Sequence, residues 1–472
     1  MTPDEFRAAG HELIDWIADR RTEVATRRVL PDVQPGDVAA RFPDTPPTET
    51  ASAAEVLGEL EELIATGITE VQHPMHFGWF PSNASLSSIL GDIASSGLGS
   101  LGISWESSPA LTEVEEVVVD WMRQLCGLSE NWHGVIQDTA STACLVAMLA
   151  ARERATDHAQ TRGGLRNRPA ALCVYTTAEA HSSVRKGALL AGFGANDIRV
   201  IDVDPWTRDM LPAQLAEVMQ ADVDAGHQPA IVVASAGSTG VTAFDPIGEI
   251  AAIASIHNAW IHVDAAMAGS AMVLPEMRFR FDGIEEADSI SWNPHKWFGT
   301  ILDCSLMYLR DPQHLIRVMS TNPSYLQSTA AGDATQYRDW GVPLGRRFRA
   351  LKLWYQLRID GIASIQTRLR RDLENAQWIA DEFAALDDWE LVAPVRLQTV
   401  CIRHNPGGSL SGSALDEHSL RWVRELNSSG RAFLSPSLLD DQWMVRISVG
   451  AESTERPHLE RLIVLIRAVA EA

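Results

Sequence analysis

Cysteine is scarce in this chain: five of its 472 residues are cysteines, and they lie far apart. No two of them form a CxxC pair. The sequence therefore predicts neither a disulfide framework nor a cysteine zinc site. The five are Cys126, Cys144, Cys173, Cys304 and Cys401.

Positive charge is also in short supply. Lysine and arginine total 39 against 62 acidic residues, for a formal net charge of −23. This excess repels nucleic-acid phosphates and anionic membrane surfaces, so we expect neither as a partner. Long apolar runs are missing too, since none approaches the roughly 18 residues that a membrane span needs. The N-terminus carries acids where a signal peptide is apolar, and we expect a cytoplasmic protein.

Hydrophobic residues make up 46% of the chain. That share is enough to form the core of a large domain with smaller flanking parts. We expect an N-terminal helical segment over 1–75, a large α/β domain over 76–345 and a small α+β domain over 346–472. Helical spacing covers 4–27 and 53–66, with a proline-rich connection between them. These two helices have too little between them to make a core, so they should lie on a larger body, in the same subunit or in a partner.

The middle of the chain alternates β-rich apolar runs with amphipathic helical segments such as 212–221 and 247–257. This alternation predicts a mostly parallel, buried sheet with helices on both faces. The predicted strands are 171–177, 197–203, 230–236, 259–265, 289–292 and 305–310.

A lysine follows one of these strands directly, in the segment Ser291–Trp297 (SWNPHKW). Flanking proline, histidine and tryptophan set Lys296 in a constrained turn. Partial desolvation there lowers an amine's pKa and leaves a neutral nucleophile that can form an imine. The alternative is an ordinary surface lysine.

An aspartate, Asp264, ends the strand that lies one strand–helix unit before Lys296, within HVDAA. In that crevice it needs a cationic partner, and the protonated pyridine nitrogen of pyridoxal 5′-phosphate (PLP) is one. Ala265 and Ala266 are small enough for a flat ring to lie against the backbone. The alternative for Asp264 is a capping role.

Two further elements are weaker by themselves. Thr139, Ala140 and Ser141 come just before an apolar helix from about 142 to 153, and free N–H groups there suit a phosphate, although any helix N-cap looks similar. His181 follows the strand at 171–177, where an imidazole can stack on the ring from the side opposite Asp264. A structural or exposed histidine is its alternative.

Together these elements resemble the group II PLP-dependent decarboxylases, most closely the aromatic-L-amino-acid decarboxylases. The resemblance implies the fold-type I, aspartate aminotransferase-like α/β architecture. It also implies a homodimer with the active site at the interface, in which the N-terminal helices wrap the partner subunit. It runs from end to end through EFRAAGHELIDWIA, PDVQPGD, HPMHFGWFPS, GISWESSPALTEVE, IQDTAST, EAHSSVRKGA, HVDAAMAG, WNPHKWF, DCS and PLGRRFRALK.

Carried over residue by residue, the resemblance implies that Lys296 binds PLP as an imine and that Asp264 pairs with the pyridinium. His181 would stack on the ring. Tyr325 matches the loop tyrosine that protonates Cα after CO2 leaves, and it would act with His181. The remaining cofactor-binding residues would be Thr139, Ala140, Ser141, Asn293 and His295 around the phosphate, with Ser238 and Ala266 near the ring.

The resemblance also implies a mostly apolar, aromatic-bearing substrate wall, some of it from the neighbouring subunit. It lacks an obvious cation for a second carboxylate, which disfavours glutamate. Trp79 and Met267 stand where tyrosines are common in the family, so a preference for phenol or catechol rings does not follow. We expect an aromatic L-amino acid, with a tryptophan-like substrate favoured and phenylalanine, tyrosine and DOPA as alternatives. The wall would comprise Trp79, Phe80, Pro81, Ser82, Leu101 and Ile103.

Other readings stay open. A phenylalanine in place of the loop tyrosine marks the related aldehyde synthases, and Tyr325 argues against that activity. An aminotransferase of the same fold, and a decarboxylase of histidine or another apolar amino acid, are further alternatives. His73 and His76 could be two metal ligands, but Pro74 lies between them without a third ligand nearby, so packing is favoured and no metal is expected. A binding or scaffold protein would be expected to lose Lys296 or Asp264, and this chain keeps both.

Overall fold

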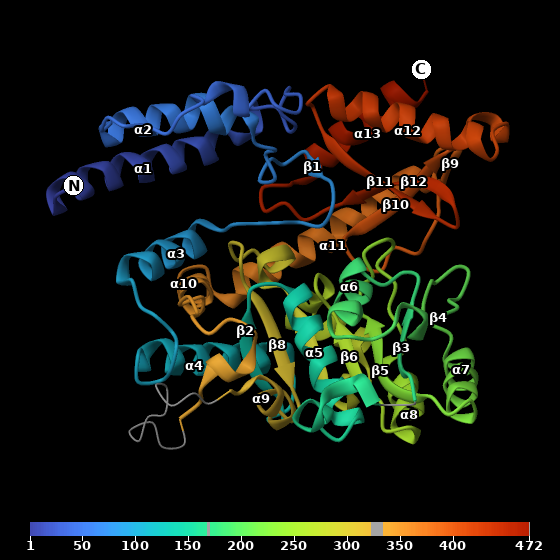
Figure 1. Ribbon diagram of the computed structural model, residues 1–472. Helices are drawn as coiled ribbons and strands as arrows, with labels where there is room; N and C mark the ends of the chain where they lie inside the picture. Colours follow the sequence, from blue (N-terminus) through green and yellow to red (C-terminus); the bar gives the residue numbers. More distant parts are fainter. Residues whose placement is uncertain (168–169, 322–333, 472) are drawn as a thin grey trace. The chain divides into compact units, whose positions relative to one another are not determined.

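The computed structural model describes residues 1–167, 170–321 and 334–471 (Figure 1). The chain's internal contacts divide it into two compact units. The first comprises Met1–Pro81, Glu374–Val392 and Val400–Ala472, and the second comprises Ser82–Leu373 and Ala393–Thr399. The two ends of the chain therefore share one unit. The three-part division expected from the sequence stays a prediction.

The second unit is built on a seven-stranded sheet in the order β2-β8-β7-β6-β5-β3-β4. Strands β4, β3, β5, β6 and β7 pair in parallel, and β8 runs antiparallel to both of its neighbours. Every residue of β3, β6, β7 and β8 is buried, as in a sheet covered on both faces. The mostly parallel sheet is thus confirmed. Its strands are β2 His133–Gln137, β3 Leu172–Thr177, β4 Ile198–Ile201, β5 Gln228–Ser235, β6 Trp260–Asp264, β7 Ser289–Trp292 and β8 Ser305–Leu309.

The central helix of this unit is α5, Ala140–Ala155, which packs on β5, β6, β7 and β8 (Figure 1). Its small apolar residues, among them Ala143 and Ala147, are completely buried in the same cluster as Val174 and Ile231 of the sheet. The other helices are α3 Leu86–Leu98, α4 Pro109–Cys126, α6 Ser182–Leu190, α7 Pro212–Asp224, α8 Ile247–Ile256, α9 Gln313–Met319 and α10 Ala350–Ile359.

Three features differ from the sequence-based expectation. Strand β2 was not predicted, because its first residues, His133 and Gly134, give little β-signal. Helix α5 begins at Ala140 rather than 142, since Thr139 caps it and accepts the Thr142 amide. The run RRFRALKLWYQLR predicts a helix from about residue 346, but helix α10 begins at Ala350, so the arginines before it lie outside the helix.

The first unit contains a five-stranded sheet in the order β1-β11-β12-β10-β9, with β1 parallel to β11. Helices α1, Pro3–Glu23, and α2, Ala53–Glu59, bury none of their residues completely, so they make no core of their own, as predicted. Helix α11, Ile362–Ala384, contributes to both units. The remaining elements are β1 His76–Phe77, β9 Trp389–Leu391, β10 Thr399–His404, β11 Phe433–Leu439, β12 Gln442–Ser448, α12 Ser413–Ser428 and α13 Arg456–Ala470.

Across the residues that the structure describes, no helix combines the length and apolarity that crossing a bilayer requires.

Two glycines allow a test of the packing in the second unit. Gly283 has a φ of +88°, and a Cβ there would lie 2.3 Å from the Cα of Gly248 in α8. Gly226 has a φ of +82°, and a Cβ there would meet nothing within 4 Å. The two positions therefore share backbone strain and differ in the space available to a side chain.

We expect Gly226→Ala to cost about 1 kcal/mol of stability through the left-handed backbone alone. Gly283→Ala should cost about 1–3 kcal/mol more, because the backbone of α8 must move. Thermal unfolding of the two variants measures the difference. An equal loss of stability in the two variants would show that α8 makes room for a side chain at position 283 at no cost in free energy.

Candidate active site

The candidate residues stand where neighbouring parallel strands end. Asp264 is the last residue of β6, and Lys296 follows β7. Ser238 follows β5, and His181 follows β3. Strand β2 runs in the same direction as β7, because both pair antiparallel with β8, so the N-terminus of α5 lies at this edge too. Open α/β sheets bind their ligands at this edge.

Lys296 lies in a tight turn, Pro294–Phe298, that interrupts helical geometry. Its φ and ψ are −99° and −116°, and Gly299 closes the turn with a φ of +104°. The four other residues of the turn are buried, whereas Lys296 is partly exposed. The predicted constrained turn is therefore confirmed, and packing on both sides of the lysine fixes where its side chain leaves the backbone.

Asp264 is tied to this turn by the backbone. The amide of Ala265 donates to the carbonyl of Ser291 (2.9 Å), and the amide of Asn293 donates to the carbonyl of Ala266 (2.9 Å). The Asp264 carboxylate is 9% exposed, and its Oδ1 accepts the Ala266 amide at 3.0 Å. These bonds hold the ends of β6 and β7 together just before the chain reaches Lys296.

His181 caps helix α6. Its Nδ1 accepts the amide of Ser183 at 3.2 Å and lies 2.7 Å from that residue's hydroxyl. Because Nδ1 is an acceptor, the neutral ring carries its proton on Nε2. Desolvation lowers the pKa of His181, with the Asp264 carboxylate opposing the shift and the Lys296 ammonium adding to it. The structure thus brings His181, Asp264 and Lys296 into one electrostatic environment.

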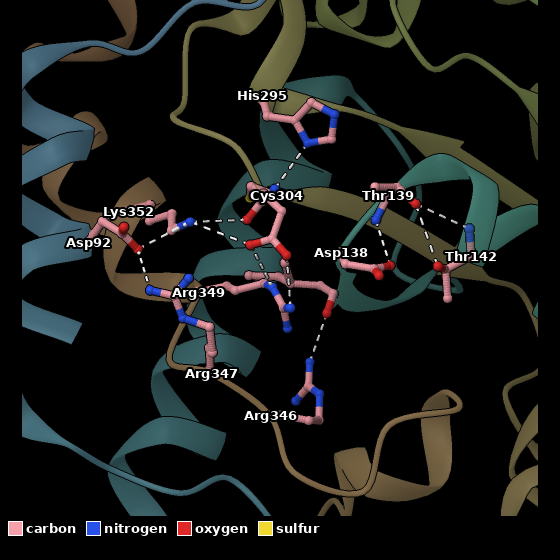
Figure 2. Close-up of polar contacts among 12 residues, drawn as sticks. Asp92, Asp138, Thr139, Thr142, His295, Cys304, Arg346, Arg347, Arg349 and Lys352 are labelled. Atoms are coloured by element: carbon pink, nitrogen blue, oxygen red, sulfur yellow. Dashed lines mark hydrogen bonds and ion pairs between the residues drawn. The ribbon is translucent and has the colours of Figure 1, made fainter. Parts of the chain in front are cut away.

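The first turn of α5 offers backbone N–H groups to an anion. Thr139 is the N-cap: its Oγ1 accepts the Thr142 amide (3.4 Å), while its own amide donates to Asp138 (2.7 Å; Figure 2). Ala140 and Ser141 follow in the first turn, where amides have no acceptor within the helix. A phosphate suits such a helix start.

Asn293 and His295 add side-chain polar groups beside the Lys296 turn. Asn293 is buried, and its Oδ1 has no hydrogen-bond partner among the described residues. His295 accepts the Cys304 amide on Nδ1 at 3.0 Å (Figure 2), so its neutral ring donates through Nε2. Burial lowers the pKa of His295 to about 4, which keeps the ring neutral. The Nε2–H of His295 is a donor that fits the phosphate of PLP, whereas the unsatisfied Oδ1 of Asn293 is an acceptor and suits a donor group of a ligand, so the place of Asn293 beside the phosphate stays a prediction.

For two other predicted residues, Ser238 and Tyr325, the structure does not test the proposed role. Ser238 is buried, and its hydroxyl accepts the amide of Ala243 at 3.0 Å, which engages it in its own turn. Its role beside the ring stays a prediction. Tyr325 lies outside the described residues.

The predicted substrate residues fall in both compact units, so their convergence stays a prediction. Trp79, Phe80 and Pro81 belong to the first unit, and Ser82, Leu101 and Ile103 belong to the second. Trp79 is 53% exposed, and its ring lies 4.8 Å from Phe433 and 5.6 Å from His76. Leu101 is equally exposed at 53%.

The expectation that this wall lacks a cation for a second carboxylate stays a prediction, although one cation lies next to one of its residues. The sequence indicated no obvious cation near it, but the guanidinium of buried Arg446 lies 5.0 Å from the ring of Phe80. Arg446 is remote in sequence, on β12, so no local motif pointed to it.

A buried polar cluster behind Asp264 was also missed. His262 is completely buried on β6, with Nδ1 2.8 Å from Ser289 Oγ and Nε2 3.3 Å from Ser291 Oγ. Burial lowers its pKa to about 4, so it is neutral. The alternation of side chains along HVD places His262 on the face of Asp264, and that was the available signal.

Comparisons with known proteins agree with this geometry. The model of the pyridoxal-dependent decarboxylase conserved domain matches residues 35–405. Tryptophan decarboxylase 2 of Oryza sativa subsp. japonica is 35% identical over 99% of this chain and 95% of its own. Phenylacetaldehyde synthase of Arabidopsis thaliana is 36% identical over 100% of this chain and 96% of its own.

Among solved structures, Oryza sativa TDC with PLP and tryptamine superimposes with a TM-score of 0.96 at 36% identity. The match covers 100% of this chain and 98% of that one. A lysine in a buried turn, a carboxylate on the adjacent strand end and an anion site at a helix start are the groups that PLP requires. The chain belongs to the pyridoxal-dependent decarboxylases, carboxy-lyases whose cofactor is PLP.

Proposed function

We propose that this protein decarboxylates an aromatic L-amino acid, tryptophan-like by preference, to the amine and CO2. The observation that carries the proposal is the position of Asp264 at the end of β6 and of Lys296 just after the neighbouring strand β7, two segments that backbone hydrogen bonds tie together. Relatives similar over the whole chain are tryptophan and tyrosine decarboxylases, which supports an aromatic substrate.

PLP, when bound, supplies a conjugated ring that accepts the electrons of the breaking C–C bond. The Lys296 amine would hold the cofactor covalently. Asp264 would pair with the protonated ring nitrogen, and a low-dielectric site would strengthen that ion pair. His181, whose neutral ring carries its proton on Nε2, would stack on the ring. Backbone amides of Ala140 and Ser141 would hold the phosphate, together with His295.

The step after CO2 release requires a proton at Cα. We assign its delivery to the Tyr325 hydroxyl, acting together with His181. Delivery to C4′ of the cofactor instead would lead to transamination. The phenylacetaldehyde synthase relative makes aldehyde production the specific alternative.

An aromatic surface supports a ring-bearing substrate. Trp79, Phe433 and His76 pack together in the first unit, and the amide of Trp79 donates to Ser435 Oγ at 2.7 Å. Arg446 beside Phe80 makes a carboxylate-bearing side chain less strongly disfavoured than the sequence alone indicates. Glutamate therefore belongs in any substrate panel.

We also propose the homodimer, with the active site at its interface. Helices α1 and α2 leave an apolar hollow of about 520 Å³, lined by Leu13, Val56 and Leu60 among others. Exposed Phe6 and Ile14 extend this apolar character. A second copy of the chain is the partner that would cover it.

The first test is Lys296→Ala assayed against a panel of aromatic and aliphatic amino acids. Wild-type protein should release CO2 from tryptophan and show a visible absorbance band that borohydride bleaches. The variant should lose both, because no other amine replaces the imine. Retained turnover in Lys296→Ala would refute the assignment.

Asp264→Asn keeps the volume of the side chain and removes its charge. We expect about a thousandfold loss of decarboxylation, the equivalent of ~4 kcal/mol in the barrier, and weaker retention of PLP. Asp288→Asn is the control: Asp288 precedes β7 at the opposite edge of the sheet, where it pairs with Arg154 at 2.7 Å. Its turnover per folded molecule should match that of wild type, and near-normal kinetics in Asp264→Asn would count against the pyridinium role.

Tyr325→Phe tests the fate of the proton. Without the hydroxyl we expect the product to shift from amine towards aldehyde. Quantifying amine, aldehyde and peroxide from one reaction measures the ratio. An unchanged ratio would remove Tyr325 from the mechanism, and a wild-type enzyme that makes mostly aldehyde would favour the synthase instead.

A further inference from the structure

A buried ammonium lies behind the Lys296 turn, in a cluster that the proposed mechanism does not use. Lys352 of α10 is 1% exposed. Its Nζ lies 3.2 Å from Oδ1 of Asp92 in α3 and 3.5 Å from Oδ1 of Asp303 (Figure 2). Burying an ammonium costs several kcal/mol unless it is paired, so these carboxylates account for its presence in the interior.

Asp303 is held from a second side. Arg349 donates to it through two nitrogens, Nε to Oδ1 at 3.1 Å and Nη2 to Oδ2 at 2.9 Å. Burial acts to raise the pKa of Asp303, but the hydrogen bonds from Arg349 and the charge of Lys352 outweigh it and hold the pKa below its usual value. Asp303 is therefore a carboxylate fixed in place by two cations.

The same lysine also acts on the backbone. Its Nζ donates to the carbonyl oxygen of Asp303 at 3.2 Å. That carbonyl shares its peptide group with the amide of Cys304, which donates to Nδ1 of His295 at 3.0 Å. A cation on the oxygen polarises the peptide and makes its N–H a stronger donor. Figure 2 shows this line of contacts from Lys352 through Cys304 to His295.

The contact to Nδ1 decides which nitrogen of His295 carries the proton. With Nδ1 accepting, the neutral ring is protonated on Nε2. A second contact, from the His295 amide to the Cys304 carbonyl at 3.3 Å, fixes the backbone of both residues. His295 therefore presents one defined donor, provided that the Asp303–Cys304 peptide stays in place.

We propose that Lys352 is a positioning residue, which acts through the Asp303–Cys304 peptide to hold His295 as an Nε2–H donor to the cofactor phosphate. This inference rests on the proposed function, because it requires PLP in the site beside Asn293 and Lys296. Its specific consequence is that Lys352 acts on the phosphate rather than on the ring of the cofactor.

The test compares PLP with pyridoxal, which lacks the phosphate, by absorbance titration of the apoprotein. Lys352→Met should weaken PLP binding about tenfold and change pyridoxal binding less than twofold. Lys352→Arg, which restores a cation, should recover most of the PLP affinity. Equal loss of both ligands would overturn the proposal, because a general loosening of the site does not distinguish them.

Arg347→Ala is the matched control. Arg347 also donates to Asp92, at 3.0 Å, but it is half-exposed and its other described contact is with Ser96. Removing it disturbs the same cluster without touching the Asp303–Cys304 peptide. We expect PLP binding within twofold of wild type, and a tenfold loss here would refute a specific role for Lys352.

Two further measurements cover the case in which Lys352→Met does not fold. In wild-type protein Lys352→Ala should weaken PLP binding about tenfold, in a His295→Gln background it should cause no additional loss, and an additive loss contradicts the proposal. The second measurement is an NMR spectrum of wild-type protein labelled with ¹⁵N-histidine. The signals of His295 are identified by their absence from the spectrum of His295→Gln. They should show the Nε2–H form of the ring from pH 6 to 9. An Nδ1–H form overturns the inference. Failure of wild-type protein to bind PLP would instead refute the proposed function.

Discussion

Two backbone hydrogen bonds beyond the ends of β6 and β7 hold the candidate site together. Ala265 donates to Ser291 and Asn293 donates to Ala266, so the sheet's pairing continues past its last regular residues. Without that continuation, the segment from Asn293 to Lys296 would have no backbone hydrogen bond to the residues that follow Asp264. Their joint position depends on parallel strands in fixed register, with Asp264 opposite Ser291. Rigid backbone at this edge would allow one flat ring to meet the Lys296 amine and the Asp264 carboxylate together.

The surroundings of the ionisable groups near the ends of β6 and β7 shift their pKa values in defined directions. Desolvation lowers the pKa of both His181 and His295, and each accepts a backbone amide on Nδ1, which places the proton of the neutral ring on Nε2. Asp303 stays ionised because Arg349 and Lys352 face it. The site thus combines neutral donors of known tautomer with fixed charges behind them, which is the preorganisation that electrostatic catalysis needs.

The strands that carry Asp264 and Lys296 could be predicted from the sequence, because the signals for them lie within a few residues of each strand. The run SISW and the apolar strand before HVDAA predicted β7 and β6, because period and composition act over a few residues. What escaped prediction depends on partners far away along the chain. Lys352 looks like a solvated lysine on an amphipathic helix, yet Asp92 and Asp303 bury it. Arg446 lies over Phe80 only because β12 is folded next to that segment, and no motif near residue 80 could indicate it.

The first unit combines segments from both ends of the chain, and this affects the order in which the protein can fold during synthesis. Strand β1, near residue 76, pairs in parallel with β11, which begins at Phe433. Synthesis on the ribosome delivers these partners at opposite ends of translation, so the second unit can assemble while the first still waits for its C-terminal half. During that interval Phe77 of β1, which is completely buried in the folded unit, lacks the strand that pairs with it. Nascent chains of this protein should therefore depend on chaperones at their N-terminal end, long after that segment has emerged.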